Sequence, residues 1–274
     1  MGSLLMGYDI ETQNPNGTRL FVEAIRALHR KLEWPFSLFC CGQTVALQPQ
    51  YFAELARDPL IDIESHTYTH MRLKTVYIMG PQAATVHKGA RVFRGGSVEQ
   101  VEEEIAKTNT LLEPLLGRKV EGLTGPWGYY RGLADRPDLL DVCARHGLHF
   151  LRTWARDHLD GQPTPYQEPF FYSSQGHPEI LECFVHGYQD DFYYNAFCEQ
   201  PHPQGFKGYL LELAGQIASE NLTWSACSHD HVAADADLKK KLAWLEPFLC
   251  AAKQAGVAGL DYRRYYQRRS ANAA

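Results

Sequence analysis

Two short segments of this 274-residue chain carry side chains that could hold a metal ion. The segment GYDIET places Asp9 and Glu11 on either side of Ile10, and residues two apart on a strand point to the same face. Two carboxylates so close repel each other unless one of them binds a cation. The alternative is a strand-end turn with solvated acids, and these residues alone leave both interpretations open.

The segment ESHTYTH places His66 and His70 four residues apart. On a helical turn this spacing brings both imidazoles to one face, at a separation suited to one zinc ion. A chance pair is the alternative in a chain with 12 histidines. Thr67 stands where the metalloprotease motif H-E-x-x-H requires glutamate, which excludes that class. Two histidines and a carboxylate from another strand would complete a three-ligand catalytic site.

Two further segments could supply catalytic groups. SHDH ends an apolar run, and His229 there could act as a general acid, whereas we interpret His231 as a structural histidine. LTGPWGYY surrounds Trp127 with glycine and proline and adds Tyr129. Such a turn can direct a backbone N–H toward a developing oxyanion, and its aromatic rings can form a platform for a sugar. A packed strand-to-loop turn explains the same residues nearly as well.

The elements that position these residues alternate along the chain. Short β-rich runs are separated by segments of helical period, which is typical of βα units and a parallel sheet. Seven or eight such units without a linker predict one α/β domain over residues 1–274, a closed or nearly closed (β/α) barrel. A doubly wound sheet is the alternative, but no G-x-G-x-x-G follows the first strand. We expect strands at 3–10, 35–41, 60–66, 119–125, 148–154, 179–185, 222–229 and 257–262, and helices at 17–32, 48–57, 97–116, 136–147, 207–220 and 236–256.

Chemistry in a parallel barrel occurs at the carboxyl ends of the strands, and the polar residues named above gather at those expected ends. Two long connections, 74–96 and 161–178, are expected to cover the site.

Composition excludes several classes of protein. The net charge of −5 gives no reason to expect nucleic acid or an anionic membrane as a partner, and the basic run RRYYQRR predicts a solvated helix end or tail. No stretch is long and apolar enough to span a bilayer, and no secretory signal is visible. None of the seven cysteines shows C-x-x-C spacing, so we expect reduced thiols and a cytoplasmic location.

The order of the motifs resembles that of the polysaccharide deacetylase family, carbohydrate esterase family four. An acidic pair ends the first strand, H-[ST]-x-x-H ends the third, a Pro-aromatic turn follows the fourth and a histidine ends the seventh. The resemblance extends from about Leu4 to the last helix. It implies a distorted (β/α) barrel of about seven parallel strands that holds one divalent metal, usually zinc.

The resemblance also implies roles for individual residues. Glu11, His66 and His70 would bind the metal, and Asp9 would be the general base that activates water. His229 would protonate the leaving amine. The metal and a backbone N–H near Trp127 would stabilise the oxyanion, with Tyr129, Arg152 and Trp154 as further candidates around the substrate.

Three departures from the family pattern concern the substrate more than the metal. Ile10 separates acids that are adjacent in most members, a variant that we associate with branches acting on intracellular or non-polymeric amides. The usual third-motif arginine, which orients the catalytic acid, aligns with Thr124, and Arg152 could supply that charge. The Asp-Trp pair of the fourth motif is echoed only by Trp154 and Asp157.

The leading hypothesis is therefore a metal-dependent hydrolase that removes an acyl group, most often acetyl, from a small carbohydrate or related amide. One alternative is a ring-opening amidohydrolase that resembles the allantoinase-like branch. Another is a non-catalytic carbohydrate-binding protein on the same barrel.

Overall fold

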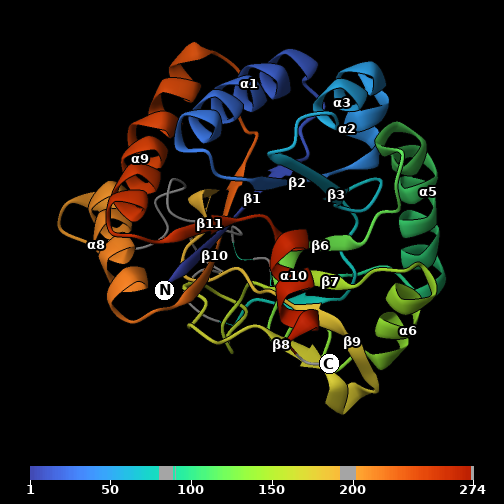
Figure 1. The fold of residues 1–274 in the computed structure, drawn as a ribbon. Helices are drawn as coiled ribbons and strands as arrows, with labels where there is room; N and C mark the ends of the chain where they lie inside the picture. The colour runs from blue at the N-terminus through green and yellow to red at the C-terminus, as the bar shows by residue number, and fades with distance from the viewer. Residues whose placement is uncertain (80–88, 90, 192–201, 273–274) are drawn as a thin grey trace.

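A mostly parallel sheet, in which β8 is the antiparallel strand, forms the centre of the protein (Figure 1). The computed structural model describes residues 1–79, 89, 91–191 and 202–272. Within these residues the order is β10-β1-β2-β3-β6-β7-β9-β8, and β11 also pairs with β1. The strands are β1 (Ser3–Ile10), β2 (Phe36–Cys40), β3 (Ile61–Ser65), β6 (Gly122–Tyr129), β7 (Phe150–Trp154), β8 (Phe170–Tyr172), β9 (His177–Glu182), β10 (Thr223–His229) and β11 (Ala258–Leu260).

Helices cover the outside of this sheet, as Figure 1 shows. They are α1 (Pro15–Leu32), α2 (Gly42–Ala46), α3 (Pro49–Leu55), α5 (Val98–Leu116), α6 (Pro137–Arg145), α8 (Gly205–Ser219), α9 (Asp235–Gln254) and α10 (Tyr262–Ala271). The start of α5 is the capping box expected from sequence, because the Ser97 side chain accepts from Gln100 N and the Gln100 side chain accepts from Ser97 N.

The predicted strands and long helices are all present, and the fold is the mixed α/β arrangement of (β/α) barrels. Strand order decides between the two predicted architectures. A doubly wound sheet reverses its order partway, whereas here β1, β2, β3, β6, β7 and β9 follow one another in chain order and β10 returns beside β1.

Both long connections contain more structure than the sequence indicated. The first carries a small hairpin, β4 (Val76–Tyr77) with β5 (Val92–Phe93), and its residues 80–88 and 90 lie outside the described part. The second contains β8 and a 3₁₀ turn, η1 (Ser173–Gln175).

Alternation along β1 separates core from site. Leu4, Met6, Tyr8 and Ile10 pack toward the helices, so the intervening Leu5, Gly7 and Asp9 face the barrel interior. The adjacent strand β10 pairs in register with it, and Asp9 lies opposite His229. The period of a strand therefore carries the acid predicted from GYDIET into the interior at the carboxyl end.

The basic C-terminal run lies in the last helix, α10, one of the two predicted alternatives, but this helix is only partly solvated. Its Tyr262 and Tyr265 are buried. Arg263 forms ion pairs with Asp62 and with Glu64, which is fully buried on β3. The side chain of Arg263 is therefore held against the barrel, because the buried carboxylates of Asp62 and Glu64 require a cationic partner.

In the described residues no helix is both long and apolar enough to cross a membrane. The cysteines within that part of the chain are free thiols, as expected.

Candidate metal and hydrolytic site

The predicted metal ligands meet at the carboxyl ends of β1 and β3. Oε2 of Glu11 lies 3.1 Å from Nε2 of His66 and 2.8 Å from Nε2 of His70. One carboxylate oxygen and two imidazole nitrogens form a donor set that zinc accepts. Ligand atoms around a tetrahedral zinc lie about 3.3 Å apart, so an ion would fit after shifts of a few tenths of an ångström.

A loop, and not the helical turn that we predicted, brings the two histidines together. Residues 66–70 are not helical, and both Thr67 and His70 have a φ of 62°. This left-handed backbone is costly for a non-glycine residue and is typical of functional sites. Glu104 on α5 holds the loop by accepting hydrogen bonds from the backbone N–H of Tyr68 at 2.8 Å and of Thr69 at 2.7 Å.

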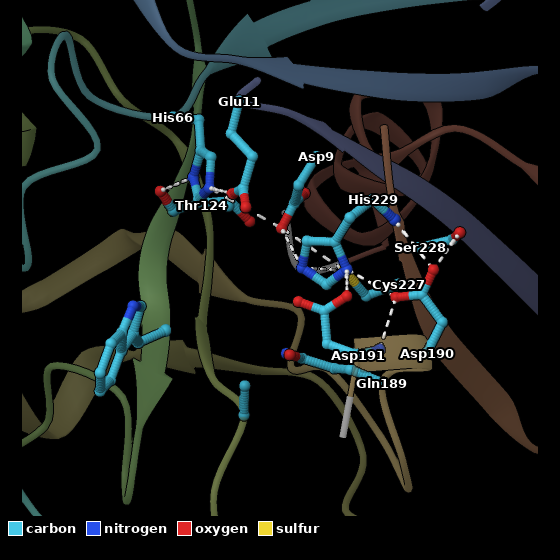
Figure 2. Close-up of polar contacts among 12 residues, drawn as sticks. Asp9, Glu11, His66, Thr124, Gln189, Asp190, Asp191, Cys227, Ser228 and His229 are labelled. Carbon is cyan, nitrogen blue, oxygen red and sulfur yellow. Dashed lines mark hydrogen bonds and ion pairs between the residues drawn. The ribbon is translucent and has the colours of Figure 1, made fainter. Parts of the chain in front are cut away.

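The orientation of His66 is fixed from the next strand. Nδ1 of His66 lies 3.0 Å from the backbone oxygen of Thr124 on β6, so this nitrogen carries the proton and Nε2 is free to bind a cation. Figure 2 shows the resulting direction of the ring, with Glu11 on its other side. The Thr124 carbonyl therefore performs the orienting role that metal-binding histidines require.

His231 joins the same site, whereas the sequence had suggested a purely structural histidine. Its Nε2 lies 2.7 Å from Oε1 of Glu11, the carboxylate oxygen that does not face His66 and His70. Burial opposes ionisation of Glu11, but hydrogen bonds from the three histidines hold its pKa well below the usual range. Burial also opposes charge on His231, but Asp191 and Glu11 raise its pKa to about 10. This contact leaves one oxygen of Glu11 for an ion.

The predicted base, Asp9, is paired with Arg152. The guanidinium of Arg152 bonds Oδ1 of Asp9 and lies with its carbon 4.4 Å from the centre of the Phe39 ring. Burial opposes the charge on Arg152, but Asp9 raises the pKa of the guanidinium above its ordinary value. From the sequence we expected that Arg152 could supply the charge that orients the catalytic acid. In the structure Arg152 pairs instead with Asp9, the predicted base. Gly7 makes room for it, because a Cβ at Gly7 would collide with the guanidinium.

The predicted acid, His229, is held by two adjacent acids. Its Nδ1 lies 2.6 Å from Asp190 and 3.2 Å from Asp191, and Lys241 of α9 lies 2.5 Å from the other oxygen of Asp190. Burial disfavours the imidazolium, but Asp191, Cys227 and Asp190 together raise the pKa of His229 well above its usual value. His229 therefore carries a proton at neutral pH, as a general acid must.

The acids at His229 were missed in the sequence. Asp157 was our candidate for the fourth motif, but its carboxylate accepts hydrogen bonds from the backbone N–H of Leu159 and Gly161. It closes a local turn and does not meet His229. The signal that could have found the true pair was GYQDDF, which supplies Asp190 and Asp191 directly after a β-rich run.

The tentative substrate residues differ in exposure: Tyr129 and Trp154 are buried, and Trp127 is partly exposed. Tyr129 is 1% exposed, and its hydroxyl accepts from Leu73 N at 2.7 Å, so this ring belongs to the core and not to a sugar platform. Trp154 is largely buried and donates from Nε1 to the Arg156 backbone oxygen. Trp127 is partly exposed, has a φ of 73° and packs on Phe93.

The three parts form one continuous site, with Asp9 between the ligand cluster and the acid (Figure 2). Oδ2 of Asp9 lies 3.9 Å from Nε2 of His66 and 3.8 Å from Nε2 of His229. A carboxylate and an imidazolium therefore lie side by side next to the candidate metal ligands. Such an arrangement can remove a proton from water and deliver another to a leaving group.

Comparisons with known proteins concern the family and the fold. The profile of a family described as polysaccharide deacetylase matches residues 13–150. No functionally curated protein sequence matches the chain.

Several solved structures share the fold at low identity. A Mycobacterium smegmatis protein described as a polysaccharide deacetylase is 16% identical, with a TM-score of 0.66 over 99% of this chain and 91% of its own. The Puue allantoinase is 14% identical, with a TM-score of 0.67 over 97% and 89% of the two chains. A Bacillus anthracis protein described as a carbohydrate esterase family 4 pseudoenzyme is 12% identical, with a TM-score of 0.53 over 96% and 66%.

Proposed function

Because this chain belongs to the polysaccharide deacetylase family, we propose that it is a metal-dependent hydrolase of a non-peptide amide C–N bond. We further propose that it removes an acetyl group from an N-acylated carbohydrate or similar small molecule. The observation that carries the proposal is the position of Oε2 of Glu11, within 3.1 Å of both His66 Nε2 and His70 Nε2 and beside the Asp9 and His229 pair.

With a metal bound, different side chains would hold the ion and transfer the protons. When bound, a divalent ion such as zinc supplies Lewis acidity and lowers the pKa of water from 15.7 to about 7. Glu11, His66 and His70 would hold it. Asp9 would accept the proton of the attacking water, and Arg152 keeps one of its oxygens fixed, so that Oδ2 faces the site.

His229 would complete the reaction by protonating the leaving nitrogen. An amide nitrogen leaves poorly as an anion, so a proton must reach it as the C–N bond breaks. Nδ1 of His229 is bonded to Asp190, which directs the proton on Nε2 toward the site. The acid and the base are separate residues, so neither has to change its role during the cleavage. A backbone N–H near Trp127 is our candidate for a second oxyanion donor.

The substrate class separates the leading proposal from its alternatives. A ring-opening amidohydrolase would use the same groups on a cyclic amide. We retain this alternative because an allantoinase shares the fold. Product analysis distinguishes the two, because a deacetylase releases free acetate and a ring-opening enzyme yields an acid without acetate. A carbohydrate-binding protein without activity would bind a glycan and show no turnover with metal present.

Elemental analysis tests the metal site directly. The purified protein should hold about one zinc or other divalent ion per chain, and the His66→Ala and His70→Ala variants should hold little. Equal metal in all three proteins would refute the site. Trp244→Phe is the control, because it also replaces a buried aromatic ring but is not among the proposed metal ligands.

The two acids can be told apart by their variants. Asp9→Asn should keep the metal and lose activity, because the base is gone and the ligands remain. Glu11→Ala should lose both. If Asp9→Asn released the metal and Glu11→Ala kept it, the roles of the two acids would be reversed.

A further inference from the structure

A second group of metal-ligand atoms lies beside the first. Oδ2 of Asp9, Sγ of Cys227 and Nε2 of His229 form a triangle with sides of 3.4, 3.8 and 3.9 Å. The residues come from neighbouring strands, and β1 and β10 pair in register with Asp9 opposite His229. All three side chains belong to rigid strand ends and not to loops.

The size of the triangle suits a small divalent ion. A point equidistant from atoms separated by 3.4, 3.8 and 3.9 Å lies about 2.1 Å from each of them. Zinc binds imidazole nitrogen and carboxylate oxygen at about 2.0–2.2 Å and thiolate sulfur at about 2.3 Å. An ion slightly above the plane of the triangle would therefore meet all three atoms without movement of the backbone.

The surroundings of the triangle also suit a cation. Asp190 accepts from Nδ1 of His229, the carboxylate–histidine arrangement that fixes Nε2 as a metal-binding atom. Arg152 engages Oδ1 of Asp9 and leaves Oδ2 for an ion. The carboxylates of Asp190 and Asp191 lie beside His229 on the far side of its ring from the triangle.

We propose that Asp9, Cys227 and His229 form a second site for a thiophilic divalent ion such as Zn²⁺, Co²⁺ or Cd²⁺. On binding, Sγ of Cys227 and Nε2 of His229 each lose a proton to solvent, and the ion takes the place of both protons. No group changes oxidation state. The site is distinct from that of Glu11, His66 and His70, which contains no sulfur.

Occupancy of this second site inhibits the enzyme. This consequence rests on the proposed function, because the ion would occupy the base Asp9 and the acid His229 together. A first equivalent of zinc would activate through Glu11, His66 and His70, and an excess would inhibit. Binding of the second ion is independent of the proposed function and can be measured without a substrate.

Cobalt titration provides the test, because Co²⁺ bound to thiolate gives a charge-transfer absorption in the near ultraviolet that nitrogen and oxygen ligands do not give. The metal-free protein should take two equivalents of Co²⁺ and develop this band. Cys227→Ser and Cys227→Ala should take one equivalent and show no band. Cys41→Ser is the matched control, because Cys41 is also a buried thiol near the site and should retain the band.

A His66→Ala, His70→Ala double variant separates the two sites. It should lose one equivalent of Co²⁺ and keep the thiolate band. Loss of the band in this variant, its persistence in both Cys227 variants, or a single equivalent without a band in the parent protein would overturn the second site. A parent protein that takes only one equivalent of Co²⁺, shows the band and loses both in the Cys227 variants would instead refute the proposed function alone.

Activity measured against zinc concentration tests whether an ion in the second site inhibits the enzyme. Activity of the parent protein should fall by at least tenfold when zinc exceeds one equivalent per chain. The residual activity of Cys227→Ser should change less than twofold over the same range. Equal inhibition of both proteins would refute the inhibitory role while leaving the binding result in place.

Discussion

Replacement of Asp190 by asparagine tests the acid in the proposed mechanism. Asp190 is fully buried and lies 2.6 Å from Nδ1 of His229. The asparagine side chain would keep the shape of the aspartate and remove its charge. The imidazolium of His229 would then lose one of two adjacent carboxylates, because Asp191 at 3.2 Å remains.

The expected magnitude follows from this geometry. An opposite charge within hydrogen-bond distance raises the pKa of a histidine by about 1–3 units, and one unit corresponds to about 1.4 kcal/mol. Burial lowers the pKa of His229, and Asp191, Cys227 and Asp190 raise it, so loss of Asp190 alone should lower it by about 1–2 units. A general acid works only when protonated. The alkaline limb of kcat against pH should therefore move to lower pH by the same amount.

The same substitution also leaves Lys241 without its partner. Lys241 is 7% exposed and lies 2.5 Å from Asp190, and removing one member of a buried pair costs about 3–5 kcal/mol. Asp190→Asn should therefore be less stable in urea denaturation. The Asp190→Asn, Lys241→Met double variant should recover most of that stability, because it leaves no buried cation at this position. It should not return the pKa of His229 to the parent value.

The assay combines denaturation with NMR titration of the His229 ring in the metal-free protein, so it needs no substrate. Substrate turnover against pH is the second readout. An unchanged or higher pKa of His229 in Asp190→Asn would refute the charge pairing. Full recovery of the pKa in the double variant would show that the effect came from misfolding around Lys241.

Three further substitutions test other parts of the structure. Gly7→Ala should cost about 1–3 kcal/mol of stability and reduce kcat, because the new methyl displaces Arg152 from the base; thermal denaturation and turnover measure both. Glu104→Gln should weaken zinc binding about tenfold in chelator competition, because the loop that carries the metal-binding histidines loses a charged acceptor. Burial lowers the pKa of His29 to about 3, so stability should be lost as pH falls below the unfolded value of about 6.5. Between about pH 7.5 and about pH 5 the parent should lose about 2 kcal/mol more than His29→Gln in urea denaturation.

The sequence predicted those features that depend on local periodicity. Alternation in SLLMGYDI placed Asp9 on one face of β1, and the structure shows that face in the barrel interior. The spacing of His66 and His70 predicted correctly that the two imidazoles lie together, but it predicted the wrong backbone conformation. A helical turn and a left-handed loop can both bring residues four apart together, and only the contacts with Glu104 and α2 select the loop.

Features that depend on distant contacts were not predictable from a pattern. Asp190 and His229 are separated by 39 residues, and GYQDDF marks two acids after a strand but does not show which distant residue they contact. Asp157 looked equally suitable because it also follows a strand. The carboxylate of Asp157 accepts hydrogen bonds from two backbone N–H groups of its own turn. This contact is visible only in the folded loop.

Arg152 shows how strand register brings a charge from β7 to Asp9 on β1. The sequence lacks arginine at Thr124, yet β6 and β7 pair in register with Thr124 opposite Arg152. Neighbouring strands of a parallel sheet lie about 4.8 Å apart, a distance that an arginine side chain spans easily. Gly7 leaves space for the guanidinium beside Asp9, and Thr124 accepts a hydrogen bond from its Nε. A guanidinium on β7 therefore lies at the same level of the barrel as Thr124 on β6, because the two residues are partners in the register of the strands.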